Sequence, residues 1–368
     1  MIDHHPENER IKRRYLDHLK GPRGLSEDAV DAAAVALFRF EEYTRFRDFK
    51  SFHVNQAIHF KAHLETQKGR SGRLLSKATL CSTLANLKRF FQWLSEQSGY
   101  RSRVNYSDAE YFNASEKDGR IAGARREPRF PTLEQVKHVI AAMPAGTDIE
   151  RRNRALVALV FLTGARISAV ASFKLKHVDI ADNCVRQDAR EVKTKFSKTF
   201  TTWFLPVGDE IRDIVVAWVC YLREELLWGN DDPLFPATRV AVGENRCFEA
   251  AGLDRKPWGD GAPIRKIFRE AFEAAGLDYY HPHSFRHTLT QLGQRVCKTP
   301  EDFKAWSQNL GHENVMTTFT SYGQVSSNRQ AEIIRGLGAP DMAANDDLET
   351  TIQRAVQKAL NGGGDRGR

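Results

Sequence analysis

The residues that could do chemistry lie in four short stretches of the second half of the chain. They are two arginines, one lysine, two histidines and one tyrosine: Arg166, Lys193, His283, Arg286, His312 and Tyr322. Arginine suits a phosphate diester because its planar guanidinium binds two phosphate oxygens and stays charged. A tyrosine phenol is a reasonable nucleophile because its leaving ability makes the covalent step reversible. This set of side chains could therefore hold one phosphodiester and attack it without a metal.

The first arginine and the lysine are both predicted at turns. Gly164 is predicted to end a helix, and Arg166 follows it by two residues. The side chain of Arg166 can therefore project from this turn into a cleft. Lys193 stands at the end of a predicted strand, beside the turn of a hairpin. Lys195 and Lys198 follow closely and remain alternatives to Lys193.

The second arginine and both histidines are predicted near helix ends. His283 and Arg286 are three residues apart at a predicted helix start, so both project from one helical face. His287 lies four residues after His283, but neither a third ligand nor an HExxH glutamate accompanies the pair, so we expect no zinc. Gly311 is predicted to end a helix, with His312 just beyond it. Tyr322 is the one tyrosine of nine that follows such a glycine–histidine pair.

In this order the stretches Thr163–Ser168, Lys193-Thr194, His283–Thr288 and Leu310–Gly323 resemble the catalytic domain of the tyrosine recombinases, the phage integrase family. The resemblance covers roughly residues 129–324. It implies that Tyr322 attacks the scissile phosphate, forms a 3′-phosphotyrosyl bond and releases a 5′-hydroxyl. It also implies that Arg166, Arg286 and His312 hold the phosphate, Lys193 protonates the leaving oxygen and His283 assists proton transfer. No metal, nucleotide or other cofactor is required.

The chain departs from the family pattern at three points. Ala169 stands where the family usually carries a carboxylate that supports the first arginine. Tyr322 follows His312 by ten residues, one more than the commonest spacing. Ser284-Phe285 replaces the Asp-Leu often found between the histidine and the arginine. None of these changes removes a phosphate ligand or the nucleophile.

The first 112 residues are predicted to form a helical domain that binds DNA. The clearest helix runs near Lys77–Glu96, with Ser76 as its N-cap. One face is apolar at helical spacing and predicts core: Leu80, Leu84, Leu87, Phe91 and Leu94. The residues predicted to meet DNA are Lys77 at the helix start, and Ser82, Thr83, Lys88 and Arg89 on the opposite face.

The rest of the chain divides into three further parts. Residues 113–130 are polar and basic, with Arg125 and Arg126 as candidate DNA contacts, and predict an interdomain linker. Residues 131–336 predict a catalytic domain of helices around a hairpin formed by 184–193 and 200–206, and 237–262 form an insert without an assigned role. Residues 337–368 predict a tail with one amphipathic helix, whose apolar stripe is Leu348, Ile352, Val356 and Leu360. The predicted fold is therefore mainly α with a small β-sheet.

Composition fits a DNA-binding protein of the cytoplasm, associated with the nucleoid. The net charge is +8, and nine lysines and arginines face only two glutamates between Lys61 and Asn105. Phosphate neutralisation along a duplex would explain this excess, and an ordinary solvated surface is the alternative. The five cysteines form no CxxC pair, and no apolar run reaches the length of about 18 residues that a membrane span needs.

We expect a site-specific recombinase that acts on double-stranded DNA as a homo-oligomer, with a tetramer on two sites and possible help from a DNA-bending protein. The first expected role is that of an integrase or a transposon-encoded recombinase. Three alternatives stay open: a resolvase of replicated circles, a type IB topoisomerase-like enzyme, and a silent DNA-binding regulator on the same fold.

Overall fold

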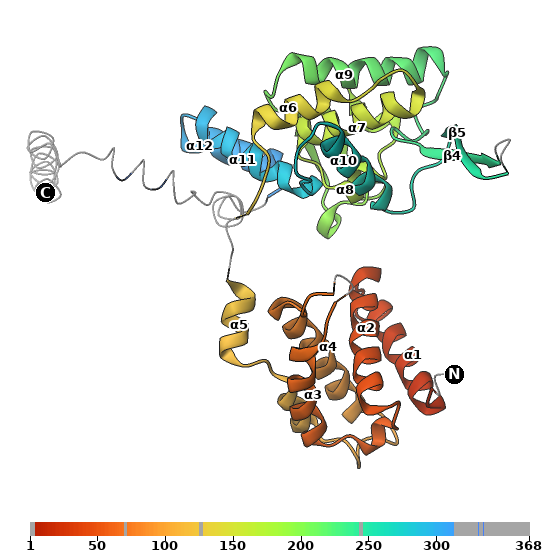
Figure 1. The fold of residues 1–368 in the computed structure, drawn as a ribbon, viewed down its shortest axis with the longest axis vertical. Helices are drawn as coiled ribbons and strands as arrows, with labels where there is room; N and C mark the ends of the chain where they lie inside the picture. Colours follow the sequence, from red (N-terminus) through yellow and green to blue (C-terminus); the bar gives the residue numbers. More distant parts are fainter. Residues whose placement is uncertain are drawn as a thin grey trace, which may run out of the picture. The chain divides into compact units, whose positions relative to one another are not determined.

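The chain forms two compact units. The computed structural model describes residues 4–69, 72–124, 128–242 and 246–312, together with residues 330 and 334. The division falls between Met1–Arg126 and Glu127–Arg368 (Figure 1).

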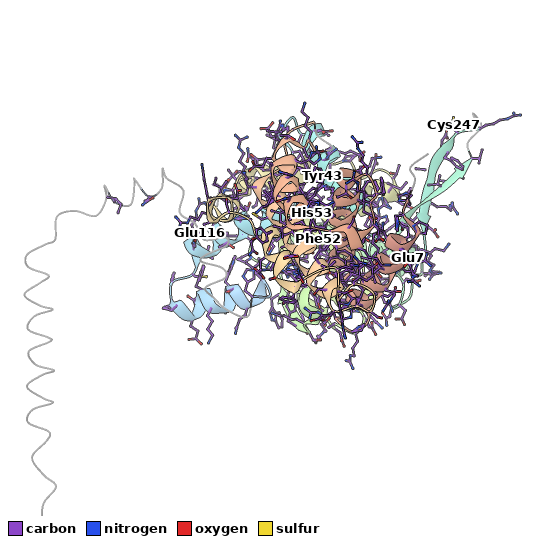
Figure 2. The ribbon with its side chains drawn as sticks, turned by 90° about the horizontal axis from the view of Figure 1, so that it is seen from below. Glu7, Tyr43, Phe52, His53, Glu116 and Cys247 are labelled. Atoms are coloured by element: carbon purple, nitrogen blue, oxygen red, sulfur yellow. The ribbon has the colours of Figure 1, made fainter. Side chains whose placement is uncertain are left out.

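The N-terminal unit is built from helices. In chain order these are α1 (Pro6–Lys20), α2 (Glu27–Thr44), the short η1 (Phe49–Ser51), α3 (Val54–Thr66), α4 (Lys77–Ser95), η2 (Tyr106–Phe112) and α5 (Glu116–Gly123). Their core is rich in phenylalanine: the Phe91 ring lies 4.0 Å from Phe52 and 5.2 Å from Phe112, measured between ring centroids. Figure 2 marks Phe52 among these helices.

Helix α4 confirms the helix that was predicted near Lys77–Glu96. The Ser76 side chain accepts a hydrogen bond from the Thr79 backbone N–H at 3.1 Å, as expected of an N-cap. All five residues of the predicted core face are buried. One prediction for the opposite face was wrong, because Thr83 is buried and its hydroxyl accepts a hydrogen bond from Arg39.

Helix α5 lies inside the segment that was predicted as a linker. Ser115 caps its start, and the Asp118 carboxylate pairs with Lys77 of α4 at 2.6 Å. The glycines and the charges of this segment suggested a loop, but the Ser115 cap and packing against α4 support a helix here. The chain therefore remains part of the N-terminal unit up to at least Gly123.

The second unit combines helices with a small sheet. Its helices are α6 (Leu133–Ala142), α7 (Asp148–Thr163), α8 (Ile167–Val170), α9 (Asp209–Cys220), α10 (Ala262–Ala274), α11 (Phe285–Val296) and α12 (Pro300–Asn309). Helix α7 is the central one, since every residue from Ala155 to Thr163 is at most 1% exposed. A capping box between Thr147 and Glu150 fixes its start. The described residues thus confirm a mainly α fold with small antiparallel sheets.

The predicted hairpin is confirmed but is shorter than expected. Strands β2 (Cys184–Gln187) and β3 (Phe200–Trp203) pair antiparallel, with Val185 opposite Thr202. A strand of two residues that the sequence did not reveal, β1 (Val178–Asp179), adds to β2. The loop between β2 and β3 carries Lys193, Lys195 and Lys198.

The insert at 237–262 contains a second hairpin. Strands β4 (Ala237–Val242) and β5 (Phe248–Asp254) pair antiparallel and extend from the body of the second unit (Figure 1). The sequence pattern does not predict these strands because glycines interrupt the alternation of apolar and polar residues. None of the helices in the described part of the chain has the length and apolar content to span a bilayer.

Candidate active site

Gly164 creates the turn that presents the first arginine. It caps α7 with a φ of 61°, a conformation that favours glycine, and its N–H binds the Val160 carbonyl at 2.8 Å. A Cβ at this position would lie 2.8 Å from the Leu310 side chain. Arg166 follows as the half-buried residue that precedes α8, and it lines a cleft as predicted.

Arg286 joins three separate parts of the second unit. The residue is 3% exposed, and its guanidinium donates to the Gly164 carbonyl at 2.6 Å and to the Leu310 carbonyl at 2.5 Å. The same nitrogen that binds Leu310 lies 2.7 Å from Nε2 of His312. One side chain on α11 therefore fixes the end of α7 and the chain just after α12.

His312 is held against Arg286 by a second glycine turn. Gly311 has a φ of 72°, and a Cβ there would lie 2.8 Å from the Phe200 ring of β3. A larger residue would push the hairpin away from His312. Because the guanidinium can only donate, Nε2 of His312 must accept this hydrogen bond and carry no proton.

The electrostatics of the cleft keep both histidines neutral. Burial, together with the charges of Arg286 and Arg166, lowers the pKa of His312 to about 3. The same causes lower the pKa of His283 to about 4, although part of this residue is exposed at the surface. At neutral pH these imidazoles can therefore accept protons but do not add to the positive charge.

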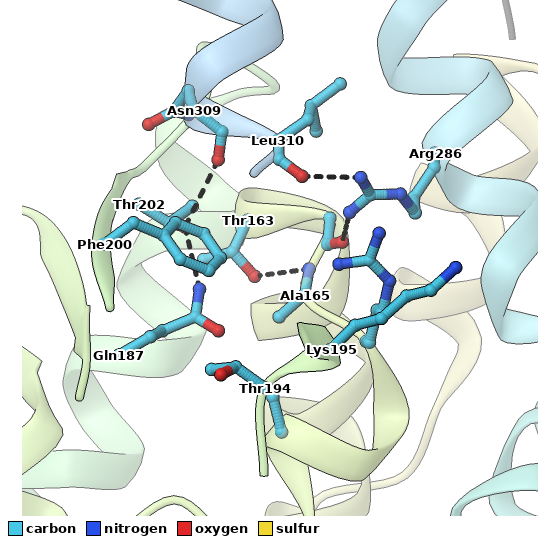
Figure 3. A pocket seen from close by; sticks show the side chains of 13 residues that line it. Thr163, Ala165, Gln187, Thr194, Lys195, Phe200, Thr202, Arg286, Asn309 and Leu310 are labelled. Carbon is cyan, nitrogen blue, oxygen red and sulfur yellow. Dashed lines mark hydrogen bonds between the residues drawn. The ribbon is translucent and has the colours of Figure 1, made fainter. Parts of the chain in front are cut away.

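The three candidate lysines occupy different positions in the β2–β3 loop. Lys195 lines the same cleft as Arg166 and Arg286, and Figure 3 shows its side chain among those that line it. Lys193 is exposed and does not line this cleft, although its backbone N–H binds Ser172 Oγ at 2.9 Å and so fixes its position next to α8. Lys198 lines a separate hollow beside His312. Of the three, Lys195 is therefore the one that lines this cleft, whereas the sequence motif assigned the proton donor to Lys193.

The far wall of the cleft is a polar chain that sequence analysis missed. Gln187 of β2 donates to Thr202 Oγ1 at 2.8 Å, and Thr202 in turn donates to the Asn309 carbonyl. The Asn309 side chain also accepts a hydrogen bond from the Trp203 N–H and donates one to the Trp203 carbonyl, as the backbone of an extra strand would. These bonds attach the small sheet to the end of α12. Nothing in the local sequence distinguishes such residues from surface polar groups.

The remaining predicted residues near the cleft have distinct surroundings. His283 lies in the short turn η6 (Pro282–Ser284), just before α11. The His287 ring stacks on Phe130 with centroids 5.5 Å apart, so it packs inside the second unit. Ala169 is buried in the cleft wall, and in the described part of the chain Arg166 makes no ion pair. Within those residues no group of three histidines, cysteines or carboxylates could hold a metal.

Some predicted residues lie outside the described residues. These are the nucleophile Tyr322, the linker residues Arg125 and Arg126, and the tail helix. On α4, Lys77 pairs with Glu65 and Asp118, and Lys88 pairs with Glu110, each at 2.6–2.7 Å. Arg89 is exposed and lies 3.4 Å from the Asn86 side chain. Exposed ion pairs of this kind contribute only about 0–1 kcal/mol, so a DNA phosphate could replace the carboxylates.

The fold and the cleft agree with what comparison with known proteins shows. A family model described as the phage integrase family matches residues 129–329, which is more than half of the chain. The chain therefore belongs to the phage integrase family, the tyrosine recombinases, which cut and rejoin DNA. This confirms the resemblance that the sequence motifs gave.

Several relatives match over most of their length. Tyrosine recombinase XerC of Lactobacillus delbrueckii subsp. bulgaricus is 24% identical over 318 residues, which cover 84% of this chain and 92% of that protein. Tyrosine recombinase XerC of Pseudomonas putida strain W619 is 23% identical and covers 84% and 90%.

Solved structures share the fold at lower identity. A lambda integrase dimer bound to a COC′ core site matches with a TM-score of 0.57 at 12% identity, over 87% of this chain and 97% of that one. The XerH site-specific recombinase bound to a palindromic difH substrate also gives 0.57, at 19% identity, over 88% and 83%.

The lowered pKa of His312 predicts a loss of stability in acid. Between pH 6.5 and about 3 the unfolded chain binds a proton at this histidine that the folded chain does not bind. Unfolding is therefore favoured as the pH falls, by at most about 2 kcal/mol between pH 6.5 and 5. Thermal unfolding at pH 7 and 5 should show a smaller fall in Tm for His312→Gln, which keeps an acceptor for Arg286. His59→Gln, on the exposed side of α3, should behave like the parent. An equal fall in all three proteins would contradict this account.

Proposed function

We propose that this chain is a site-specific recombinase that binds duplex DNA at defined sites and exchanges strands between two of them. The observation that carries the proposal is the gathering of Arg166, Arg286 and Lys195 in one narrow cleft. Positive side chains fixed at close range suit a phosphodiester and the charge that develops on it during transfer. Arg286 is already oriented by its two carbonyl bonds, so little ordering is needed when DNA binds.

The proposed reaction is transfer of a phosphoryl group to a tyrosine and back. The Tyr322 oxygen attacks the scissile phosphorus, the bond to the 5′ oxygen breaks, and that oxygen takes a proton from a lysine. Arg166, Arg286 and the Nδ1–H of neutral His312 hold the non-bridging oxygens, and neutral His283 accepts the phenol proton directly or through water. The 5′-hydroxyl of a second strand then reverses these steps, which conserves the energy of the bond.

The acid in this scheme is a lysine of the β2–β3 loop. Lys193 is our assignment from the motif, and its backbone is anchored beside α8 while its side chain is exposed and can turn. Lys195 is the competing assignment because it lines the cleft. The N-terminal unit would contact the duplex through Lys77, Lys88, Arg89 and the linker arginines.

For the biological role we propose integration or transposition of a mobile element. Resolution of replicated circles uses the same chemistry and is the main alternative. Incubating the protein with one plasmid that carries two candidate sites from its own genomic flanks distinguishes the possibilities. Joined products indicate recombination, whereas relaxed plasmid without joining indicates a topoisomerase-like enzyme. Binding without a covalent adduct would leave only a regulator.

The nucleophile assignment predicts the behaviour of Tyr322→Phe. We expect this variant to bind site DNA as the parent does but to form no covalent adduct on a nicked suicide substrate, because the attacking oxygen is gone. A denaturing gel measures the adduct. Tyr280→Phe is the matched control and should form it normally, since the Tyr280 ring packs near Phe272 outside the cleft. An adduct with Tyr322→Phe would refute the assignment.

Loss of the lysine that acts as the general acid should slow cleavage, and a modified substrate should restore the rate. We expect Lys193→Ala to cleave roughly 10²–10⁴-fold more slowly, because the leaving 5′ oxygen lacks a proton. Substrate with sulfur at that position should restore the rate, since a thiolate departs without protonation. Lys195→Ala and Lys198→Ala are tested in parallel. If sulfur restores the rate of Lys195→Ala instead, the lysine that lines the cleft is the acid.

The predicted tail helix should matter for assembly. A lone amphipathic helix of this length is marginal in water and needs a surface to pack on. We expect deletion from Asp346 onward to leave binding to one site nearly intact but to abolish the complex of two sites. Native gels with one and two labelled sites measure both. Normal pairing by the shortened protein would refute the idea, and insoluble protein would instead indicate packing on its own chain.

A further inference from the structure

The β4–β5 hairpin is held firmly at its base by a buried arginine. Arg152 of α7 is 2% exposed, and it donates to the Pro236 carbonyl at 2.8 Å and to Thr238 Oγ1 at 3.0 Å. Its guanidinium also lies over the Trp258 ring, 4.9 Å from the centroid. Burying an arginine is costly, so these bonds indicate that the direction of the hairpin is fixed by the fold.

A second arginine supports the other side of the base. Arg255 pairs with Asp232 at 2.6 Å and lies 5.4 Å from the Trp228 ring centroid. The Ala237 N–H closes the base by binding the Lys256 carbonyl at 2.8 Å. The hairpin is therefore a supported arm and not a loose loop.

One face of this arm is apolar and exposed. Val242 pairs with Phe248 and Val240 pairs with Ala250, so the four side chains share a face. Val240, Val242 and Phe248 are 58%, 64% and 82% exposed. Two strands alone are marginal in water, and a contiguous apolar patch on a soluble protein often marks an interaction surface.

The charge of the arm argues against DNA as its partner. Residues 237–254 contain two arginines and three acidic residues, a net charge of −1 in a chain of +8. A surface that binds phosphates needs an excess of lysine and arginine. An apolar face with balanced charge fits a protein surface instead.

The second unit also carries a groove that, like the arm, is apolar and has balanced charge. It lies between α7 and α9, has a volume of about 430 Å³, and its walls include Ile214, Ala217, Trp218 and Tyr221. Arg151 and Asp213 stand at its edge, so its charge is balanced as well. The Tyr221 hydroxyl donates to Asp148 at 2.6 Å, which holds this wall in place. The arm does not fill the groove of its own chain, because Val242 and Phe248 remain exposed.

We propose that the apolar face of the β4–β5 hairpin docks in the α7–α9 groove of a second copy of this chain when two copies bind neighbouring DNA sites. The proposal rests on the proposed function, since DNA brings the copies together. Because arm and groove are different surfaces, the contact runs head to tail and can continue around a closed ring. A contact this small is weak in free solution, but DNA raises the effective concentration of the second copy.

The test measures binding to DNA with one site and with two adjacent sites on native gels. Phe248→Asp should bind one site within twofold of the parent, whereas its affinity for the second site should fall roughly 10- to 100-fold, the value of one buried aromatic side chain. Ala241→Asp is the matched control, because it adds the same charge to the opposite face of the arm, and it should bind both sites as the parent does.

The groove is tested by Ala217→Asp, at an exposed position of α9. This variant should lose second-site binding to the same extent, and the double variant should lose no more than either single one, because both changes break one contact. Additive losses of second-site affinity would overturn the proposal. They would mean that the arm and the groove contact different partners, one of which could be the tail helix. Weaker binding to one site by Phe248→Asp would also overturn it, since the arm would then touch DNA.

Crosslinking gives a direct measure of the contact. Cys247, at the outer end of β5, is the one exposed cysteine among the five (Figure 2). The parent protein is mixed with a second copy that carries Ala217→Cys and Cys247→Ser. A short bismaleimide should join Cys247 of the parent to the thiol introduced at position 217 of the second copy, and only on DNA with two sites. Absence of this product would refute the contact.

The covalent adduct on a single nicked site separates this inference from the proposed function. Phe248→Asp should form that adduct at the parent rate, because the arm lies outside the cleft. If the parent protein forms no adduct, the proposed function fails. If the adduct forms but second-site binding is unchanged in Phe248→Asp, only the docking proposal fails.

Discussion

The second unit depends on one guanidinium. Arg286 binds the carbonyl of Gly164 at the end of α7 and that of Leu310 after α12, and it also meets His312. Gly164 is far in the sequence from Leu310 and His312, and these bonds bring the two segments within reach of one side chain. Because the carbonyls belong to helix ends that lack partners within their own helices, the arginine satisfies groups that burial would otherwise leave unpaired. The same bonds orient its charge toward the cleft.

Two glycines make this arrangement possible, and each does so for a steric reason. At Gly164 a side chain would strike Leu310, and at Gly311 it would strike the Phe200 ring. Both residues also have a positive φ, which a larger residue adopts only at a cost. At both turns the backbone must therefore lie close to neighbouring side chains, and the candidate site residues Arg166 and His312 follow these turns.

Around this rigid centre the positive side chains differ in how tightly they are held. Arg286 is buried and fully oriented, while Arg166 is half-buried and has Ala169 in the place where a carboxylate would support it. The lysines lie on a loop attached to the body through Ser172 and through the bonds of Asn309 to β3. This difference in how tightly the side chains are held suits a reaction in which one phosphate is bound throughout but the proton donor must move. The cost of gathering these charges is offset when an anion binds between them.

The sequence alone determined the parts of this protein that follow local rules. Helix α4 with its Ser76 cap, the core face of Leu80 to Leu94, the β2–β3 hairpin and the turns before Arg166 and His312 are set by periodicity, capping residues and glycines, which act over a few positions. The motifs also identified the family. Tertiary structure decided the rest, because it depends on contacts between distant residues. It made part of the predicted linker into the capped helix α5, which packs against α4, and it buried Thr83 against Arg39. It also placed Lys195 rather than Lys193 in the cleft. It also folded the unassigned insert into a hairpin on Arg152, because that buried arginine binds Pro236 and Thr238, which lie more than eighty residues away, as well as its neighbour Asn153.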